Sequence, residues 1–487
     1  MAESRFSGAL QITNLDDFIT PSQECVKPVE YKKRYDTGAK IKIQSKDYVE
    51  INKKESEKLE KVEITLADCL ACSGCITSAE SVLVSQQNQQ ELYRIFKDKK
   101  NQQGISIQLI VVSLSVQPIL SLAERYNLEP EDTALRLSGY FRKLGADIIL
   151  DMTVADDLAL LESGKEFIKR YNNYQKNLNN KEKGKEKEIP MLASSCPGWI
   201  CYAEKTHGNF ILPYISNTKS PQQIMGSLVK YHLSQLKKIS PENIYHVTLM
   251  PCYDKKLEAY RDDFLNKSIN SRDVDCVITS IELEQMLEQE NKKLNDFEAN
   301  KIDLPFGEIN CFNKSKHIFS HSGSGSGGYA EFIFKYAAKN LFQMTDVKLQ
   351  FKDLKNPDFK EAILEKDGKV LLRFAIANGF RNIQNLVQKL KRDKCLYHYV
   401  EIMACPAGCL NGGAQIRPQN GLPSRQLVSV LESQYRKLPE INPETNLLVK
   451  KLYDSWLDGE ESDKTLALVH TQYHEIEKTN IALTIKW

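Results

Sequence analysis

The sequence lacks a charge excess, a long apolar run and a leader pattern, and each absence argues against a class of partner or location. Its 66 Lys and Arg residues almost balance its 64 Asp and Glu residues, which gives a formal net charge of +2. A balance this even does not create the field that attracts nucleic acid or an anionic membrane surface. No uninterrupted apolar stretch reaches transmembrane length. Early acidic residues, Glu3, Asp16 and Asp17, do not fit a secretory or organelle leader. We therefore expect a cytoplasmic protein with neither nucleic acid nor membrane as a partner.

The length and the cysteine content narrow the class further. A chain of 487 residues, 41% hydrophobic and 27% charged, is long enough for two or three globular lobes. Its twelve cysteines are not expected to form a disulfide framework, because the cytosol keeps thiols reduced. Those cysteines that cluster are better explained as metal ligands.

The first cluster of cysteines has the form C-x-x-C-x-x-C. Cys69, Cys72 and Cys75 can face one object only if a short loop wraps around it. An iron–sulfur cubane, which takes four thiolates, is the object favoured by this spacing. Zinc is the alternative, although zinc sites more often show paired C-x-x-C modules separated by longer gaps.

Strand and helix patterns alternate from residue 105 onward and predict an α/β protein. Strands are expected at 105–113, 146–151, 190–194, 245–250, 274–279, 347–351, 370–377 and 397–403. Helices are expected at 119–125, 155–171, 281–291, 329–341, 381–391, 426–435 and 446–456, and a solvated loop at 172–188. The predicted organisation is an irregular iron–sulfur segment over 1–100, α/β lobes over 101–270 and 271–425, and a helical tail over 426–487.

A second metal site can be assembled only from distant pieces. Cys196, Cys252 and Cys405 each lie beside a proline at the end of an expected strand, and Cys409 follows in the same turn as Cys405. One Cys-Pro pair alone would more often be a buried apolar residue. Three of them at strand ends predict a shared site, because open parallel sheets bind ligands at the carboxyl ends of their strands.

Three motifs carry a family resemblance: Ser-Ser-Cys-Pro-Gly-Trp at 194–199, Met-Pro-Cys-Tyr-Asp-Lys-Lys-Leu-Glu at 250–258, and Glu-Ile-Met-Ala-Cys-Pro-Ala-Gly-Cys-Leu-Asn-Gly-Gly at 401–413. They resemble the signature motifs of iron-only hydrogenases. More closely, the chain resembles the eukaryotic hydrogenase-like proteins of the Nar family, which act in cytosolic iron–sulfur protein assembly. The resemblance runs from about Cys25 to the end of the chain.

The resemblance implies two 4Fe–4S clusters. The ligands it implies are Cys25, Cys69, Cys72 and Cys75 for the N-terminal cluster, and Cys196, Cys252, Cys405 and Cys409 for the buried one. It also implies the iron-only hydrogenase fold, with two parallel-sheet lobes around the second cluster. The implied role links early scaffold NTPases to a late targeting complex that serves cytosolic and nuclear apoproteins, with the nucleus as a second location.

The chain also departs from the hydrogenase pattern. Hydrogenases carry two adjacent cysteines where this chain has Ser195 and Cys196, and the first of the two delivers protons to a di-iron unit. A serine hydroxyl is a much weaker acid than a thiol, whose pKa lies near ~8.5. Lys255 does match a hydrogenase residue beside that unit. We expect no catalytic residue, with an iron-only hydrogenase or another redox enzyme as the alternative and purely structural clusters as a third hypothesis.

Two further features allow more than one interpretation. Gly-Ser-Gly-Ser-Gly-Gly at 323–328 matches the dinucleotide pattern, but a tight turn that packs against the cluster pocket is the preferred interpretation. The chain ends in Trp487, whose indole and carboxylate could dock into the WD40-propeller subunit of the targeting complex. The alternative is a tail that packs on its own lobe.

Overall fold

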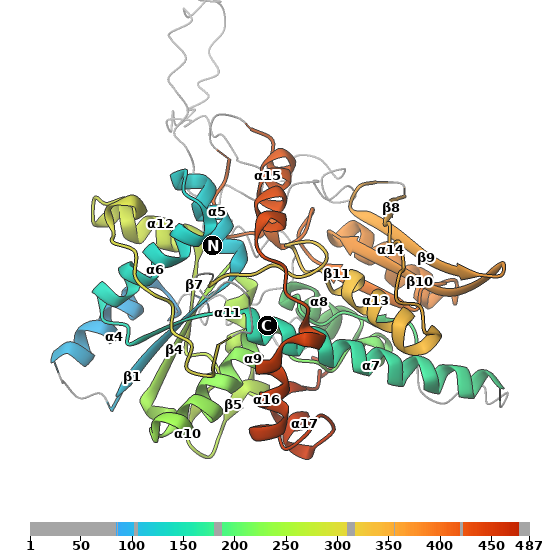
Figure 1. Cartoon of the computed structure of the whole chain (residues 1–487), viewed down its shortest axis with the longest axis horizontal. Coiled ribbons are helices and arrows are strands. Elements are labelled where there is room, and N and C mark those ends of the chain that lie inside the picture. Colours follow the sequence, from blue (N-terminus) through green and yellow to red (C-terminus); the bar gives the residue numbers. More distant parts are fainter. Residues whose placement is uncertain are drawn as a thin grey trace, which may run out of the picture.

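The computed structural model describes residues 84, 86–101, 106–179, 188–308, 317–354, 356–418 and 422–476. The predicted ligands of the first cluster and the C-terminal Trp487 lie outside these ranges, so what was predicted for them stays a prediction. The described residues form two α/β lobes that lie side by side (Figure 1). None of their helices combines the length and the apolar character that crossing a bilayer requires.

The first lobe is built on a four-stranded parallel sheet in the order β2-β1-β4-β7. Its strands are β1 (Leu109–Leu114), β2 (Ile148–Asp151), β4 (Ile244–Met250) and β7 (Cys276–Thr279). Along β1, Ile110 and Val112 pack in one hydrophobic cluster, whereas Leu109 and Val111 pack in another. Because alternate residues of a strand face opposite sides, both faces of the sheet are buried. A strand buried on both faces appears in the sequence as a continuous apolar run.

Helices cover both faces of this sheet. One face carries α4 (Gln89–Asn101), α5 (Val116–Tyr126), α6 (Pro130–Leu144) and α12 (Ser280–Gln289). The other face carries α7 (Thr153–Asn179), α9 (Pro221–Ser227) and the π-helical turn η4 (Leu228–Leu233).

The second lobe has a five-stranded sheet in the order β3-β11-β10-β9-β8. Its strands are β3 (Met191–Leu192), β8 (Lys352–Asp353), β9 (Phe359–Lys366), β10 (Lys369–Asn378) and β11 (Tyr399–Met403). The pairs of β3, β11 and β10 are parallel, whereas β9 and β8 extend the sheet in antiparallel fashion. The helices α7 and α13 (Tyr329–Phe342) pack on one face, and α8 (Pro197–Thr206) and α14 (Phe380–Lys391) pack on the other.

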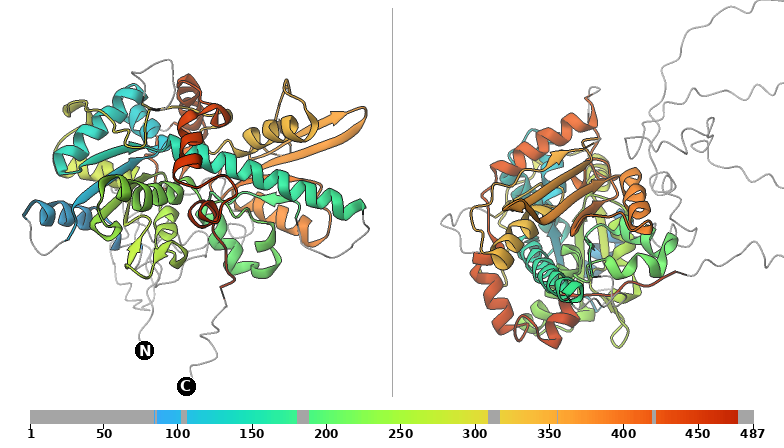
Figure 2. Two further views of the ribbon diagram at one scale, coloured as in Figure 1. Left: turned by 60° about the horizontal axis from the view of Figure 1, so that its bottom comes forward. Right: turned by 90° about the vertical axis from the view of Figure 1, so that its right-hand side faces the viewer.

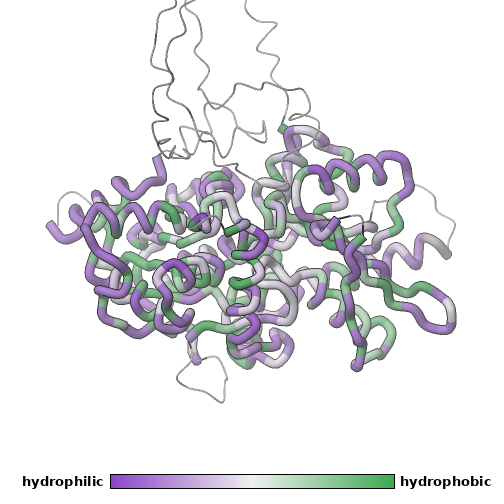
Figure 3. The backbone as a smooth tube through the Cα atoms, turned by 90° about the horizontal axis from the view of Figure 1, so that it is seen from above, coloured by the Kyte–Doolittle hydropathy of each residue, from purple (hydrophilic) through white to green (hydrophobic). Residues whose placement is uncertain are grey.

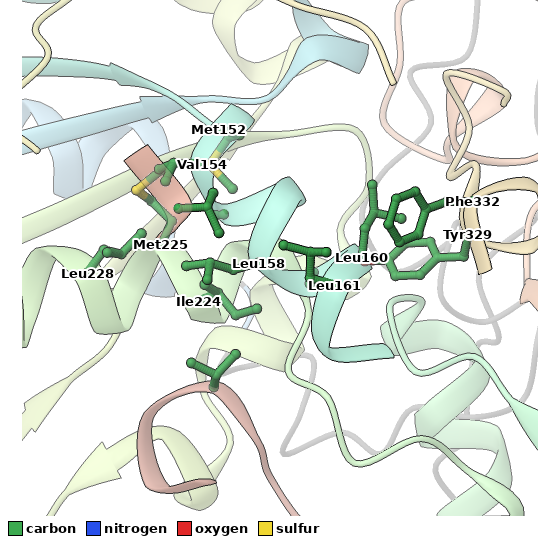
Figure 4. Packing of buried hydrophobic residues seen from close by; sticks show 14 of the residues in the cluster. Met152, Val154, Leu158, Leu160, Leu161, Ile224, Met225, Leu228, Tyr329 and Phe332 are labelled. Carbon is green, nitrogen blue, oxygen red and sulfur yellow. The ribbon is translucent and has the colours of Figure 1, made fainter. Parts of the chain in front are cut away.

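Helix α7 joins the two lobes into one core. Near its start, Leu158 lies beside Ile224 and Met225 of α9, and further along it approaches Tyr329 and Phe332 of α13 (Figure 4). Its Phe167 meets β10 of the second sheet, where the ring centroids of Phe167 and Phe374 lie 5.0 Å apart in an edge-to-face arrangement. The long helix is visible in Figure 2 as it runs from one lobe along the other. The two sheets are therefore fixed relative to each other by a shared hydrophobic cluster.

The C-terminal helices form the predicted helical tail and close the core from outside. They are α15 (Ser424–Lys437), α16 (Leu447–Ser455) and α17 (Asp463–Val469). Leu431 and Tyr435 of α15 pack against Leu120 of α5, and Trp456, just after α16, packs in the shared core.

The shorter elements are α10 (Ser234–Lys237), α11 (Asp254–Ala259), β5 (Leu265–Asn266) and β6 (Ser271–Arg272). Apolar segments gather inside and polar ones run along the outside of the molecule (Figure 3).

The α/β architecture confirms the sequence prediction, but several elements differ from what was expected. The strand expected to open the second lobe is β7 of the first sheet, and the segment 190–194, expected in the first lobe, supplies β3 of the second sheet. Strand pairing is a long-range property that local apolar patterns do not encode. Residues 347–351, which were expected to form a strand, are irregular. In this segment the pairing with β9 begins only at β8 (Lys352–Asp353). Helix α4 occupies part of the first hundred residues, and α7 continues to Asn179 through part of the expected loop.

We expect the variant His246→Gln to lose less stability in acid than the parent protein. His246 is fully buried on β4, with its Nε2 2.9 Å from Ser113 Oγ and its Nδ1 2.9 Å from the Asp273 carbonyl oxygen. Burial lowers the pKa of His246 to about 3. The unfolded chain therefore binds the extra proton below pH 6.5, and the parent should lose about 2 kcal/mol between pH 7 and pH 5 from this group alone.

Urea denaturation followed by circular dichroism at several pH values measures this difference. His474→Gln is the control, because the His474 side chain is 64% exposed and its contact with Asp263 is a surface ion pair, so its replacement should change the stability little. Parallel slopes for the parent and His246→Gln would contradict the expectation.

Candidate metal centre between the two lobes

Three loops that carry cysteines meet between the lobes. Cys196 follows β3 and caps the start of α8 in an extended conformation, with φ −97° and ψ 107°. Cys252 lies just after β4, whereas Cys405 lies just after β11 and Cys409 begins a short 3-10 turn. Because β4 belongs to the first sheet and β11 to the second, both lobes contribute thiols. Each loop leaves the carboxyl end of a parallel strand, where open sheets place their ligands.

Direct contacts join the three loops pairwise. The Sγ of Cys196 accepts a hydrogen bond from the Ala404 amide at 3.3 Å. A Cβ on Gly198 would lie 3.2 Å from the Cβ of Ala404 and 2.7 Å from Oδ2 of Asp254. A Cβ on Gly412 would lie 2.4 Å from the Pro251 carbonyl oxygen. Glycine is thus required sterically where the loops approach each other.

Cys196 and Cys405 are buried at this centre, whereas Cys252 and Cys409 are half-buried. The thiols of Cys196, Cys252 and Cys409 lie within electrostatic range of one another. Cys196 and Cys405 are each 8% exposed. Burial raises the pKa of Cys252 well above its ordinary value, and Asp254, Cys409 and Cys196 raise it further. Burial also raises the pKa of Cys196, and that of Cys409 to about 12. Thiols in such surroundings become thiolate ligands when bound cations reverse the local electrostatics.

Lys255 is the cation that favours ionisation of these thiols. It lowers the pKa of Cys196, Cys252 and Cys409, against the larger effect of burial. Its Nζ donates to the Ser195 carbonyl oxygen at 3.2 Å and lies 2.9 Å from Oε2 of Glu258. The lysine is therefore held beside the thiols from two sides.

Polar groups complete the surroundings of Lys255, and of these Glu258, Ser220 and Gln222 were not singled out from the sequence. Glu258 accepts hydrogen bonds from Ser220 and from Gln222, whose Nε2 lies 3.2 Å from its Oε1. The Ser195 hydroxyl is buried and has no hydrogen-bond partner among the described residues. The only sequence signal for this network was its proximity to the quoted motifs, because Glu258 ends one of them.

The donor set fits an iron–sulfur cluster. Four thiols on three loops supply the four ligands that a cubane takes, and glycines at the contact points allow the loops to surround a bulky group. Within the described ranges, no group of three or more His, Cys, Asp and Glu side chains is close enough to hold a single metal ion. A cubane places each thiolate on a different iron atom, so its ligands lie further apart than those of one ion. Cys196, Cys252, Cys405 and Cys409 would hold such a group.

The glycine-rich loop at 323–328 packs against this centre. A Cβ on Gly327 would lie 2.2 Å from Oε1 of Glu401 and 2.6 Å from Cε of Met403, both on β11. The other oxygen of Glu401 accepts from the Ala330 amide at 2.7 Å, at the start of α13. Burial raises the pKa of Glu401 to about 7. These contacts confirm a tight turn packed on the cluster strand, which was the preferred interpretation of the glycine pattern.

Known hydrogenases share this architecture. Residues 108–413 match the family described as "Iron only hydrogenase large subunit, C-terminal domain", and residues 426–476 match "Iron hydrogenase small subunit". An FeFe-hydrogenase structure concerned with oxygen inactivation superposes with a TM-score of 0.67 at 26% identity, covering 79% of this chain and 98% of that one. A variant of the apo hydrogenase HydA1 from Chlamydomonas reinhardtii gives 0.64 at 27% identity, covering 77% and 96%. The fold and its cysteine loops thus define a protein of the iron-only hydrogenase type.

Full-length relatives show which proteins of the iron-only hydrogenase type this chain is similar to in sequence. A protein of Anopheles gambiae named "Probable cytosolic Fe-S cluster assembly factor" is 58% identical over 492 aligned positions, covering 99% of this chain and all of the relative. A protein of Aedes aegypti with the same description is 56% identical with the same coverage. The chain belongs to the Nar family of iron-only hydrogenase-like proteins.

We expect Gly412→Ala to impair the metal centre. Its added methyl group would meet the Pro251 carbonyl oxygen, and overpacking of this kind costs about 1–3 kcal/mol. The two loops should separate, so the purified variant should bind less iron than the parent. Iron determination and a thermal melt measure both effects.

Gly368→Ala is the control for this variant. Gly368 has φ +72° and nothing within 4 Å of an added Cβ, so the change adds backbone strain of about 1–2 kcal/mol without a clash. Its iron content should equal that of the parent. If Gly412→Ala also keeps its full iron content, close contact between the loops does not matter for the site.

Proposed function

We propose that this protein is a cytosolic iron–sulfur protein assembly factor that binds two 4Fe–4S clusters. The observation that carries the proposal is the meeting of three cysteine loops from both lobes, in a chain whose full-length relatives are named as cytosolic assembly factors. The ligands of the buried cluster are Cys196, Cys252, Cys405 and Cys409, and those of the N-terminal cluster are Cys25, Cys69, Cys72 and Cys75. When bound, each cluster supplies a unit that can be passed on or can exchange one electron.

The proposed role links early scaffold NTPases to the late targeting complex, which delivers clusters to cytosolic and nuclear apoproteins. Trp487 is the proposed contact to a WD40-propeller subunit, since a terminal indole with a carboxylate is a compact anchor for a groove. The printed names of the relatives support the cytosol as the location, and the nucleus is proposed as the second.

We also propose that the centre does not turn over hydrogen. Where hydrogenases carry a proton-donating cysteine, this chain has Ser195, whose buried hydroxyl makes no hydrogen bond within the described residues. An alcohol without a basic partner is a poor proton relay. Lys255 remains in place beside the thiols, and it is the feature that keeps a redox enzyme as the alternative.

The proposed functional units follow the order of the chain. An N-terminal iron–sulfur segment over 1–100, two lobes over 101–270 and 271–425, and a helical tail over 426–487 form the proposed division. The strand β7 and the segment that supplies β3 each belong to the sheet of the other lobe. The buried cluster would therefore bridge two units that already share strands.

Anaerobic purification followed by iron and sulfide analysis, EPR of the reduced protein and a hydrogen-evolution assay tests the proposal. About eight irons per chain with cubane signals and no hydrogen are expected. Hydrogen evolution or a di-iron signal from the same sample would make the enzyme the better interpretation.

Removing a ligand of the buried cluster should destabilise the protein more than removing a ligand of the N-terminal one. Cys405→Ala and Cys409→Ala each remove a thiol from a site that joins both lobes, whereas Cys69→Ala removes one of the three closely spaced cysteines of the proposed N-terminal site. Because a bound cluster stabilises the segments that it links, the melting temperature should fall further for the first two variants. Equal losses in anaerobic thermal melts of the three variants would refute this ranking.

A further inference from the structure

A groove of about 370 Å³ opens on the second lobe, between α14 and the turn that connects β8 with β9. These elements lie together at one side of the molecule (Figure 1). Leu354, Phe359 and Leu386 supply apolar surface to the groove, and Lys389, Arg392 and Lys394 supply positive charge. No carboxylate is among the described residues that line it.

The apolar part of the groove is firmly supported. Phe359 and Leu386 are buried in the core of the second lobe, whereas Leu354 is 45% exposed at the edge. One wall is fixed by two reciprocal hydrogen bonds between the amides of Asn356 and Asn382, at 3.1 Å and 3.2 Å. The groove is thus preformed, which lowers the entropy that a ligand loses on binding.

None of the three cations forms an ion pair with a described residue, although Asp393 lies between Arg392 and Lys394 in the chain. Lys389 Nζ lies 5.3 Å from the centroid of the Phe359 ring and 5.5 Å from that of Tyr397, so the cation–π contacts hold it over the groove. Arg392 and Lys394 follow α14, and neither forms an ion pair with any residue in the part of the chain that the structure describes. Their combined charge is complementary to carboxylates.

We propose that this groove binds an extended acidic segment of a partner protein, with an apolar side chain between its carboxylates. The apolar side chain would pack on Leu354 and Phe359, and the carboxylates would pair with the cations at the rim. The amides of Asn385 and Gln388, which also line the groove, can hydrogen-bond the backbone of the segment. This docking surface goes beyond the proposed cluster chemistry, because its binding step involves no cysteine.

A fluorescein-labelled peptide, Glu-Asp-Leu-Phe-Glu-Asp-Glu, tests the proposal by fluorescence anisotropy with the full-length protein. We expect saturable binding that weakens as salt is added, because salt screens the charges at the rim. A peptide with Gln and Asn in place of Glu and Asp should bind at least about tenfold more weakly.

Variants of the groove residues test whether the peptide binds there. The triple variant Lys389→Glu, Arg392→Glu and Lys394→Glu should weaken the peptide at least about tenfold, and Leu354→Ser should weaken it severalfold without unfolding the lobe. Lys391→Glu is the matched control on the same helix, because Lys391 lies over the Phe210 ring instead of lining the groove. Equal iron content in all variants shows that the metal centre and the fold are intact.

Three outcomes would overturn the proposal. These are no saturable binding, equal binding by the triple variant and the parent, or an equal loss in Lys391→Glu, which would indicate nonspecific attraction. A chain truncated after Ile476 that binds the peptide much more tightly would show that this chain's own C-terminal segment occupies the groove. None of these outcomes changes the iron content, so the test is independent of the proposed function.

Discussion

The contact between cysteine loops across the lobe boundary is the constraint on which the rest of the structure depends. A side chain at Gly198 would displace the Asp254 carboxylate, and one at Gly412 would strike the Pro251 carbonyl oxygen. The loops can meet only because β3, β4 and β11 all end at this point, and the core shared through α7 keeps the two sheets aligned. An error in the relative placement of the lobes would separate the thiols, because each lobe holds some of the four cysteines.

Because the cysteine thiols are removed from water, their ionised form is costly unless a cation is bound beside them. The thiols of Cys196, Cys252 and Cys409 all have a raised pKa because they are removed from water, and Lys255, joined at Cys196 by the Ala404 and Trp199 amides, opposes that effect only in part. Four thiolates around an iron–sulfur cluster would be neutralised by its irons. The folding of the lobe boundary and the binding of a cluster should therefore be coupled. This coupling would suit the proposed handling of clusters.

The second lobe contributes both to the buried cysteine site and to the exposed basic groove. One part of its core surrounds Cys196 and Met403, and the same hydrophobic cluster supports Phe359 and Leu386 beneath the basic groove. The sheet ends on this side in β8, a strand of two residues, so little backbone is left open for strand pairing. Recognition at this edge would therefore depend on side chains, with positive charge at the rim and apolar surface below it.

Local patterns in the sequence were enough to predict the α/β class, most of the strands and helices, and the four cysteines whose loops meet between the lobes. Continuous apolar runs such as β1 and the periodic pattern of α14 are local signals, and the cysteine motifs resembled a known family. The folded structure was needed to show which sheet receives β7 and β3, how Glu258 and Ser195 hold Lys255, and that Leu354, Lys389 and Lys394 line one groove. These features depend on contacts between residues that are distant in the chain, and such contacts form only once the shared core has brought the lobes together.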